Sequence, residues 1–241
     1  MACLIGKDLV LGYDKHVVLS NVNFSVDQGE YLCIIGENGS GKTTLMKTIL
    51  GLIPPISGTV EYGDGLNKME IGYLPQQTEA QKDFPASVKE VVMSGFVGKM
   101  GKRPFYTKGQ RLICEENLER MRIANLRNRC YRELSGGQQQ RVLLARALCA
   151  TEKMILMDEP VSGLDPKATE EMYQLIYELN RQNQISVIMI SHDINAAVKY
   201  GDKILHVSEK PYFALKENYL KSPYFRHFKS LAGGWENGKI Y

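Results

Sequence analysis

Residues 36–43 constrain this chain most, because they read Gly-Glu-Asn-Gly-Ser-Gly-Lys-Thr, a G-x-x-x-x-G-K-T pattern. An apolar run at residues 31–35 precedes the pattern, and a helical pattern opens at Thr43. Glycines at this spacing let the backbone turn tightly and point successive N–H groups at phosphate oxygens. The start of a helix behind such a loop adds positive partial charge. The segment therefore predicts a nucleotide-binding loop between a strand and a helix.

Two residues at the end of this loop have chemical roles. Lys42 can reach the β- and γ-phosphates of a nucleotide, and the Thr43 hydroxyl can ligate Mg²⁺. A glycine-rich turn without a ligand is the structural alternative. The strand and helix patterns on either side favour the nucleotide site.

Composition places the chain among ordinary globular proteins. It has 241 residues, 44% hydrophobic and 24% charged, which is enough for a substantial core, and a formal charge of +3 is too small to indicate nucleic acid binding. Its five cysteines form no C-x-x-C pair, which fits a reducing compartment. Residues 1–7 lack a basic segment followed by a long apolar one, and no stretch approaches the roughly 20 apolar residues of a membrane span. We expect a chain that is neither exported nor membrane-spanning by itself.

The order of predicted elements indicates an α/β core with a β-rich edge. Short apolar strands alternate with helices after the loop, and a helix is expected over residues 43–50. Residues 1–30 and 56–74 have the pattern of antiparallel strands and turns, with segments 57–62 and 71–74 flanking a turn at residues 63–65. Residues 88–128 are charge-rich and helical, interrupted near 101–109, which predicts an inserted helical lobe.

A second motif is Leu-Ser-Gly-Gly-Gln at residues 134–138, which leads into a helical pattern. A serine and two exposed glycine amides at the start of a helix can form an anion site. Taken alone, Ser-Gly-Gly is more often a helix cap or a turn. The surrounding motifs favour the anion site.

A third motif is the apolar strand at residues 154–157, followed by Asp158, Glu159 and Pro160. Parallel α/β sheets bind ligands at the carboxyl ends of their strands. Asp158 could therefore hold Mg²⁺, directly or through water, while Glu159 orients and polarises the water that attacks a γ-phosphate. For an isolated Asp-Glu-Pro, the alternative is a solvated strand end before a turn.

Two further segments follow this strand. Asp165 precedes Pro166, a combination typical of a helix N-cap followed by a first-turn proline. His192 follows an apolar strand at residues 185–190, a position from which it could reach the same γ-phosphate. A histidine at a strand end is more often structural or solvated.

With these motifs in this order, the chain resembles the ATP-binding subunits of ABC transporters over residues 4 to about 207. The resemblance implies that residues 36–43 are the family's phosphate loop and residues 134–138 its signature. It also implies that residues 162–165 form the loop that crosses a dimer interface. In the same way, Asp158 is the magnesium aspartate, Glu159 the catalytic glutamate and His192 the switch histidine.

The resemblance also extends to the base-binding side and to a glutamine. Tyr13 matches the aromatic residue on which adenine stacks, and Val18 matches an aliphatic residue beside it. The family's glutamine, which links Mg²⁺ and the attacking water to the membrane subunit, falls at Gln76 or Gln77. We prefer Gln76 because it follows Pro75 directly, as in relatives, and Gln77 is the alternative.

The implied site thus has four groups of residues. Catalysis is assigned to Glu159 and His192, and magnesium binding to Thr43, Gln76 and Asp158. The residues expected to bind ATP within one subunit are Tyr13, Val18, Gly36, Glu37, Asn38, Gly39, Ser40, Gly41, Lys42, Thr43 and Thr44. Those expected to contact ATP from the opposite subunit are Ser135, Gly136, Gly137, Gln138 and Asp165.

The resemblance further implies an ATPase with ATP and Mg²⁺ as cofactors, acting as a two-fold head-to-tail dimer. Its partners would be a second copy, an integral membrane permease and, indirectly, an extracytoplasmic substrate-binding protein, with no nucleic acid. It would lie in the cytoplasm, peripheral on the inner face of the membrane. The fold expected is a P-loop NTPase core with an antiparallel β subdomain and an inserted α-helical subdomain.

We expect the ATPase domain over residues 1–207, with the helical subdomain at about 78–135. Residues 208–241 form a short C-terminal extension whose aromatic residues match no family motif. Those aromatic residues include Tyr212, Phe213, Tyr224, Phe225, Phe228 and Trp235. They could pack on the core as a short helix or contact a partner.

Within the family, residues 84–92 and 98–103 look like those of bacterial zinc and manganese importer ATPases. Iron-chelate and other import ATPases share parts of this pattern, so they are the alternatives. A DNA-repair or chromosome-organising head would need a long coiled coil between the motifs, and no heptads are sustained here. A soluble ABC ATPase serving a non-transport assembly is the third alternative.

Residues 99–111 contain five basic residues and no acidic one. A solvated basic loop is one interpretation. The other hypothesis is that this segment faces a membrane with anionic lipid. The basic residues are Lys99, Lys102, Arg103, Lys108 and Arg111.

Overall fold

The computed structural model describes residues 2–13, 16–63, 65–77 and 83–231. Asp64 of the predicted turn, residues 78–82 of the predicted helical subdomain and Trp235 lie outside these ranges. Across the described residues, no helix combines the length and apolar character that a membrane crossing requires.

A six-stranded sheet forms the centre of the molecule, in the order β5-β6-β7-β3-β8-β9. The first five strands are parallel, and β9 runs antiparallel to β8. Their bounds are β5 Ile71–Leu74, β6 Met154–Asp158, β7 Ser186–Ser191, β3 Tyr31–Ile35, β8 Lys203–His206 and β9 Tyr212–Leu215. Strands β3, β6 and β7 are buried along their whole length, which explains their continuous apolar sequences.

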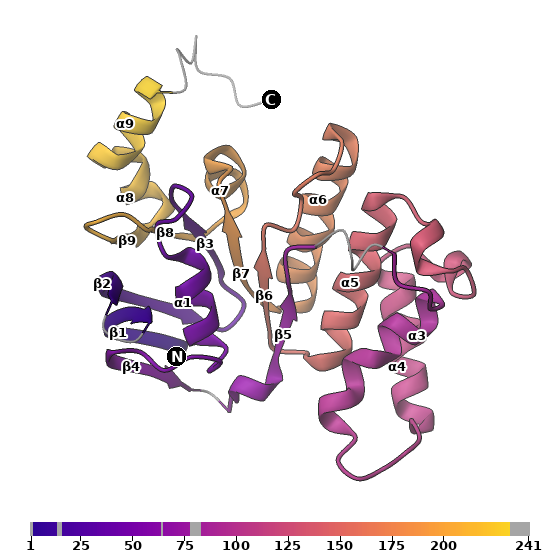
Figure 1. Cartoon of the computed structure of the whole chain (residues 1–241). Helices are drawn as coiled ribbons and strands as arrows, with labels where there is room; N and C mark the ends of the chain where they lie inside the picture. Colours follow the sequence, from indigo (N-terminus) through magenta and orange to yellow (C-terminus); the bar gives the residue numbers. More distant parts are fainter. Residues whose placement is uncertain (1, 14–15, 64, 78–82, 232–241) are drawn as a thin grey trace.

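An antiparallel sheet of three strands lies beside the central one, at the lower left of Figure 1. Its strands are β1 (Ala2–Tyr13), β2 (His16–Asp27) and β4 (Ser57–Tyr62), with β1 in the middle. Helix α1 (Lys42–Ile49) packs between the two sheets, and Leu45, Met46 and Ile49 of this helix belong to one buried cluster with residues of both. The predicted α/β core with a β-rich edge is confirmed.

The predicted partner of residues 71–74 was wrong. Instead of forming an antiparallel pair with residues 57–62, β5 runs parallel to β6, with Ile71 opposite Met154 and Leu74 opposite Met157. The 3₁₀ helix η1 (Lys68–Glu70), capped by Asn67, separates β5 from β4. Burial of Ile71 and Leu74 in the core favours the central sheet over the edge sheet.

A helical lobe covers the β5 edge of the central sheet, at the right of Figure 1. Its elements are α3 (Val88–Met93), η2 (Ser94–Lys99), α4 (Lys108–Arg120), η3 (Ala124–Leu126), η4 (Tyr131–Glu133) and α5 (Gly136–Ala150). The predicted interruption is confirmed: a loop joins η2 to α4, and α4 starts at a capping box of Thr107 and Gln110. Helix α5 packs against both α3 and α4, so the lobe extends beyond residue 135.

The face of the central sheet away from α1 is covered by helices. Tyr31, Cys33 and Ile35 of β3 point to this face, whereas Leu32 and Ile34 point toward α1. Helices α6 (Pro166–Asn183) and α7 (Ile194–Tyr200) contribute residues to the same buried cluster as the helical lobe. One continuous core therefore joins the lobe to the sheet.

The C-terminal segment packs on the core. After β9 come α8 (Lys216–Lys221) and α9 (Pro223–Leu231), at the upper left of Figure 1. Tyr219 of α8 is fully buried and its hydroxyl lies 2.8 Å from His206 Nδ1, while Tyr212 and Tyr224 stack with ring centroids 5.1 Å apart. The boundary expected after Val207 therefore falls inside a β-hairpin of the central sheet.

Candidate active site

The phosphate loop joins the carboxyl end of β3 to α1, as the sequence pattern predicted. Gly41, the N-cap of α1, has φ +101°, a left-handed conformation that L side chains rarely adopt. At Gly36, with φ +155°, an added Cβ would lie 2.3 Å from the carbonyl oxygen of Val207. These two positions require glycine because of backbone conformation and close packing.

Lys42 closes back over this loop. Its ammonium donates hydrogen bonds to the carbonyl oxygens of Gly36, at 2.8 Å, and Glu37, at 2.7 Å. Burial lowers the pKa of Lys42, while the negative charges of Glu159 and Asp158 act in the opposite direction. The ammonium is thus held at the mouth of the loop, where a phosphate oxygen can replace the carbonyl oxygens as its partner.

Eleven of the described residues line a cavity of about 520 Å³ over this loop. Tyr13 and Val18, at 45% and 40% exposure, form its apolar side, and the Lys47 ammonium lies 5.9 Å from the Tyr13 ring centroid. Thr43 is exposed toward the cavity, whereas Thr44 is buried beneath it. The lining residues are Tyr13, Val18, Asn38, Gly39, Gly41, Lys42, Thr43, Thr44, Gln76, Asp158 and Glu159.

Asp158 and Glu159 enter the cavity from the carboxyl end of β6. Asp158 is buried, and this burial together with the charge of Glu159 raises its pKa, against the opposing effect of Lys42. Glu159 has φ +47°, a conformation that costs about 1 kcal/mol for a non-glycine residue. Its N–H donates to the carbonyl oxygen of Ile190 at 3.0 Å, which fixes the carboxylate at the end of the strand.

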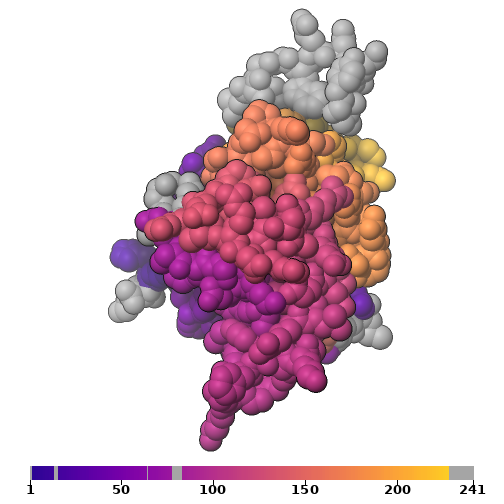
Figure 2. Space-filling view, turned by 90° about the vertical axis from the view of Figure 1, so that its right-hand side faces the viewer, coloured from indigo at the N-terminus to yellow at the C-terminus, as the bar shows by residue number. Residues whose placement is uncertain are grey.

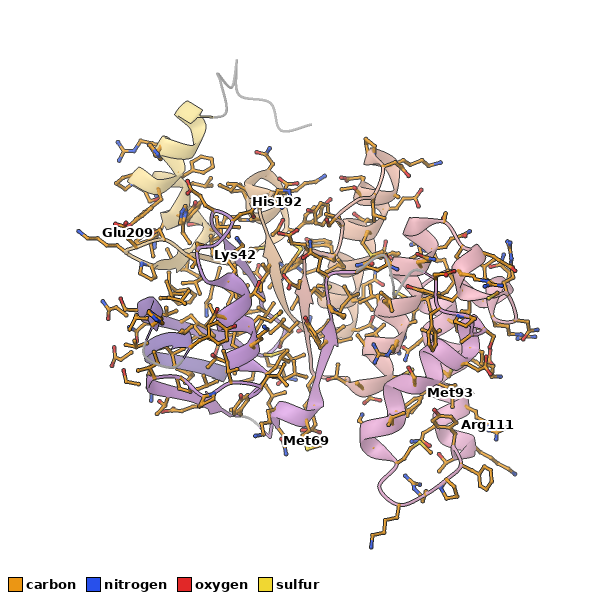
Figure 3. All side chains as sticks on the ribbon, viewed as in Figure 1. Lys42, Met69, Met93, Arg111, His192 and Glu209 are labelled. Atoms are coloured by element: carbon orange, nitrogen blue, oxygen red, sulfur yellow. The ribbon has the colours of Figure 1, made fainter. Side chains whose placement is uncertain are left out.

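Two of the described residues lie beside the Glu159 carboxylate. Gln76 Nε2 donates to Glu159 Oε2 at 3.2 Å, and His192 Nδ1 lies 3.5 Å from Glu159 Oε1. His192 follows β7, its side chain is 67% exposed, and it lies at the same end of the central sheet as Lys42 (Figure 3). Gln76, Glu159 and His192, which were predicted from three separate motifs, therefore lie together.

The two candidate glutamines point to different parts of the molecule. Gln76 faces the cavity and Glu159, whereas Gln77 Nε2 donates to the Tyr131 hydroxyl at 2.7 Å and to Gln139 Oε1 at 3.1 Å. Tyr131 and Gln139 belong to the helical lobe. The adjacent residues thus connect the cavity and the lobe, and the sequence contained no signal for the bonds of Gln77.

The signature residues lie apart from the phosphate loop. Ser135 caps α5, where its hydroxyl accepts from the Gln138 N–H at 3.4 Å, and Asp165 caps α6 by accepting from the Ala168 N–H at 3.0 Å. Both helix starts open onto one cavity of about 390 Å³, which Gly137 also lines. Gly136 does not line this cavity; a Cβ added there would lie 3.5 Å from Leu164. No phosphate-loop residue lines this cavity.

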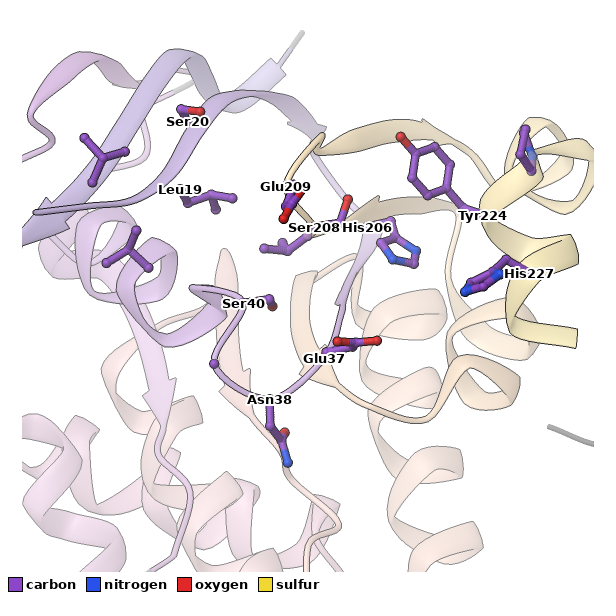
Figure 4. Close-up of a pocket in the computed structure, with 15 residues that line it drawn as sticks. Leu19, Ser20, Glu37, Asn38, Ser40, His206, Ser208, Glu209, Tyr224 and His227 are labelled. Carbon is purple, nitrogen blue, oxygen red and sulfur yellow. The ribbon is translucent and has the colours of Figure 1, made fainter. Parts of the chain in front are cut away.

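The C-terminal segment forms a further cavity behind the phosphate loop that sequence reasoning missed (Figure 4). It has a volume of about 930 Å³ and lies between Glu37, Ser40, His206 and Tyr224. Burial lowers the pKa of His206, with Glu37 acting in the opposite direction. Such contacts depend on the path of the chain after β8, which no motif indicates.

Comparison with known proteins identifies the family to which the chain belongs. A model of the ABC transporter family matches residues 19–162. The chain therefore belongs to the ABC transporter family, as an ATP-binding subunit that hydrolyses ATP. Its fold is an α/β P-loop NTPase core with an antiparallel β subdomain and an inserted helical subdomain, as predicted. Such subunits work as dimers with membrane permeases.

Three relatives show how far the likeness extends. The zinc uptake system ATP-binding protein ZurA of Listeria innocua is 34% identical over 207 residues, which cover 83% of this chain and 80% of that protein. The manganese transport system ATP-binding protein MntB of Bacillus subtilis is 38% identical over 203 residues, with 82% and 80% covered. The structure of cbiO1 from Clostridium perfringens, part of the ABC transporter complex cbiONQ, aligns with a TM-score of 0.80 at 26% identity, covering 95% of each chain.

Proposed function

We propose that this chain is the ATP-hydrolysing subunit of a bacterial importer of divalent metal, zinc or manganese, and works through a separate permease. The cargo is inferred from relatives that serve zinc uptake and manganese transport. In the described part of the chain, no three His, Cys, Asp or Glu side chains cluster so as to hold a metal ion. The cargo would cross the permease, and this subunit would supply the energy.

One observation carries the hydrolytic assignment: Glu159 lies between Gln76 and His192 at the mouth of the cavity that also contains Lys42. A carboxylate in this position can orient a water molecule and accept its proton as the water attacks the γ-phosphate. Lys42 would exchange its carbonyl partners for phosphate oxygens, and His192 would hydrogen-bond the γ-phosphate. Gln76 is assigned as the family's glutamine because Gln77 is engaged elsewhere.

The donor atoms present fit Mg²⁺. Thr43, Gln76 and Asp158 line the same cavity and offer hydroxyl, amide and carboxylate oxygens, the ligands this ion prefers. The raised pKa of Asp158 reflects a buried carboxylate beside another, a pair that a cation would stabilise. When bound, the ion would offset the charge that develops on the phosphate oxygens.

The separation of the two cavities supports a head-to-tail dimer in which ATP is shared. Tyr13 and Val18 would contact adenine in one copy, while Ser135 and the glycine amides that follow it would bind the γ-phosphate from the other. Residues 162–165, which include Asp165, would form the loop that crosses the interface. In the cell, the dimer would lie in the cytoplasm on the inner face of the membrane, with an extracytoplasmic binding protein delivering the cargo.

The catalytic assignment is tested with Glu159→Gln. The amide keeps the size of the side chain and cannot accept the proton, so the variant should bind ATP, lose most turnover and form an ATP-stable dimer. Phosphate release and size-exclusion chromatography with ATP measure these effects. Hydrolysis at the parent rate would show that Glu159 is not the base.

The shared site is tested by mixing two inactive variants, Lys42→Ala and Ser135→Arg. In a mixed head-to-tail dimer, one site combines the intact loop of one copy with the intact signature of the other. If the two sites hydrolyse independently, an equimolar mixture should recover about a quarter of the parent activity, because about half of the dimers are mixed and each has one intact site. No recovery, with both variants folded and dimeric, would contradict the shared site.

The cargo is tested by deleting the gene and restoring it as the parent or as Glu159→Gln. Elemental analysis of the cells should show that zinc or manganese falls in the deletion and recovers with the parent alone. A fall confined to iron would identify an iron importer. Unchanged metal content, with the protein bound to a soluble scaffold or ribosomes, would refute the transport function.

A further inference from the structure

The end of the helical lobe away from the nucleotide cavity carries a cluster of positive charge. We define the basic tip as residues 97–112, which run from η2 through the connecting loop into the first turn of α4. It forms the lowest part of the lobe in Figure 1 and projects from the body of the molecule in Figure 2. Its basic residues are all exposed: Lys99, Lys102, Arg103, Lys108 and Arg111.

Most of this charge has no acidic partner. No ion pair joins any of the five basic residues to another described residue, whereas Glu115, further along α4, pairs with both Lys89 and Arg127. Arg103 is occupied locally, since its guanidinium donates to the carbonyl oxygens of Met100 and Lys99 at 3.2 Å each. Arg103 keeps its positive charge, because carbonyl oxygens are neutral acceptors, and Lys102, Lys108 and Arg111 form no side-chain hydrogen bond or ion pair with another described residue.

Lys99 is the exception at the edge of the tip. The pKa of Glu70 is lowered mainly by its hydrogen bond from Lys153, and Lys99 contributes a smaller electrostatic effect. Lys99 is therefore partly offset by a carboxylate of the core.

Large apolar side chains stand among these cations. Phe105 is 78% exposed, Leu112 62% and Val97 60%. No other described part of the chain packs closely on the backbone between them at Gly98 or Gly101, where an added Cβ would meet no atom within 4 Å. The tip is thus a convex surface of separate cations around an exposed aromatic ring, not a groove that fits a peptide.

We propose that the basic tip binds the surface of a bilayer that contains anionic lipid. Lipid headgroups complement dispersed positive charges, and an aromatic ring such as Phe105 is stable at the boundary between headgroups and acyl chains. The tip lies at the opposite end of the lobe from Lys42 and His192 (Figure 3), so lipid contact leaves the ATP cavity accessible. The proposal requires that the chain works beside a membrane and does not depend on which cargo is carried.

The test is binding of the full purified chain to vesicles, measured by co-sedimentation. One set of vesicles contains phosphatidylglycerol and phosphatidylcholine in about equal parts, and the other contains phosphatidylcholine alone. The test variant combines Lys102→Gln, Lys108→Gln and Arg111→Gln. The matched control combines Lys68→Gln, Lys210→Gln and Lys221→Gln, which removes the same charge from exposed lysines outside the tip.

The parent should bind the anionic vesicles, more weakly as salt is raised, and should not bind phosphatidylcholine alone. At about 1 kcal/mol for each basic residue, the test variant should bind on the order of 100-fold more weakly. Phe105→Ser should weaken binding severalfold, and the control should match the parent. ATPase activity in solution should be unchanged in the test variant, which verifies folding.

Three results would overturn the proposal. Equal binding by the test variant and the parent would exclude the tip as the contact. Equal binding to both kinds of vesicle would exclude anionic lipid as the ligand. Binding that appears only when the permease is present, whatever the lipid, would show that the tip contacts protein instead. A cargo result that refutes metal import would leave the vesicle measurement unaffected, so the two proposals fail separately.

Discussion

Replacing each of two adjacent glutamines by leucine should produce opposite defects. Gln77→Leu removes hydrogen bonds of 2.7 Å to the Tyr131 hydroxyl and 3.1 Å to Gln139. At about 1 kcal/mol net for each bond, the loss is about 2 kcal/mol, and it rises to about 3 kcal/mol because the hydroxyl of buried Tyr131 loses its partner. Gln76→Leu removes one exposed bond to Glu159 and should change the free energy of unfolding by less than about 0.5 kcal/mol.

For catalysis, we expect Gln76→Leu to have the larger effect of the two variants. Gln76 orients the carboxylate that we assign as the base, so Gln76→Leu should lower kcat on the order of 10-fold or more. Gln77 does not line the nucleotide cavity, so ATP affinity should survive Gln77→Leu. Denaturant unfolding followed by far-ultraviolet circular dichroism gives the stability change, and steady-state phosphate release gives kcat.

Tyr131→Phe provides the control for this comparison. It removes the hydroxyl that Gln77 satisfies, so Gln77→Leu should cost about 1 kcal/mol less in the Tyr131→Phe background than alone. A coupling energy near zero would mean that the hydrogen bond contributes nothing. Equal stability loss for Gln76→Leu and Gln77→Leu would refute the division of roles between them.

Three other changes test the loop, the cavity and the C-terminal segment. Gly36→Ala should unfold at a lower denaturant concentration and bind ATP at least tenfold more weakly, because its Cβ would lie 2.3 Å from a carbonyl oxygen. The control Gly98→Ala, whose Cβ would meet no atom within 4 Å, should match the parent in both assays. Asp158→Asn should raise Tm by a few degrees and abolish hydrolysis, since the raised pKa of Asp158 means that its charge destabilises the fold at neutral pH. Burial lowers the pKa of His206, so the stability that depends on its neutral form should be complete above about pH 6.5 and decline below it. Unfolding curves of His206→Asn between about pH 5 and 7 should lack that decline, and an unchanged decline would show that His206 is not its source. An Asp158→Asn variant less stable than the parent would contradict the destabilising effect of the Asp158 charge.

Features that depend on neighbouring residues could be predicted from the sequence. The phosphate loop needs a strand, glycines and a helix in succession, and Asp158 and Glu159 need an apolar strand directly before them. Because the parallel strands end at one edge of the sheet, His192 could also be expected near Glu159, and the two lie 3.5 Å apart. Local pattern and sheet geometry together were sufficient for these positions.

Features set by distant residues could not be predicted in the same way. The direction of Gln77 depends on Tyr131 and Gln139, 54 and 62 positions away. Strand β5 lies close in sequence to β4, yet it pairs with β6 because burial of Ile71 and Leu74 outweighs proximity along the chain. The packing of Tyr219 against His206 depends likewise on a hairpin that no motif announces.

The contacts of the two glutamines bear on how a dimer would work. Gln77 joins the end of β5 to the lobe that carries Ser135, and Gln76 joins the same point to Glu159. On the proposed assignment, Ser135 of one copy binds the ATP of the other, while Glu159 hydrolyses the ATP held by its own loop. A shift of the lobe as it closes on the partner's nucleotide would therefore act, through two adjacent residues, on the carboxylate of its own site. Each copy would thus adjust its own hydrolysis to the nucleotide of its partner.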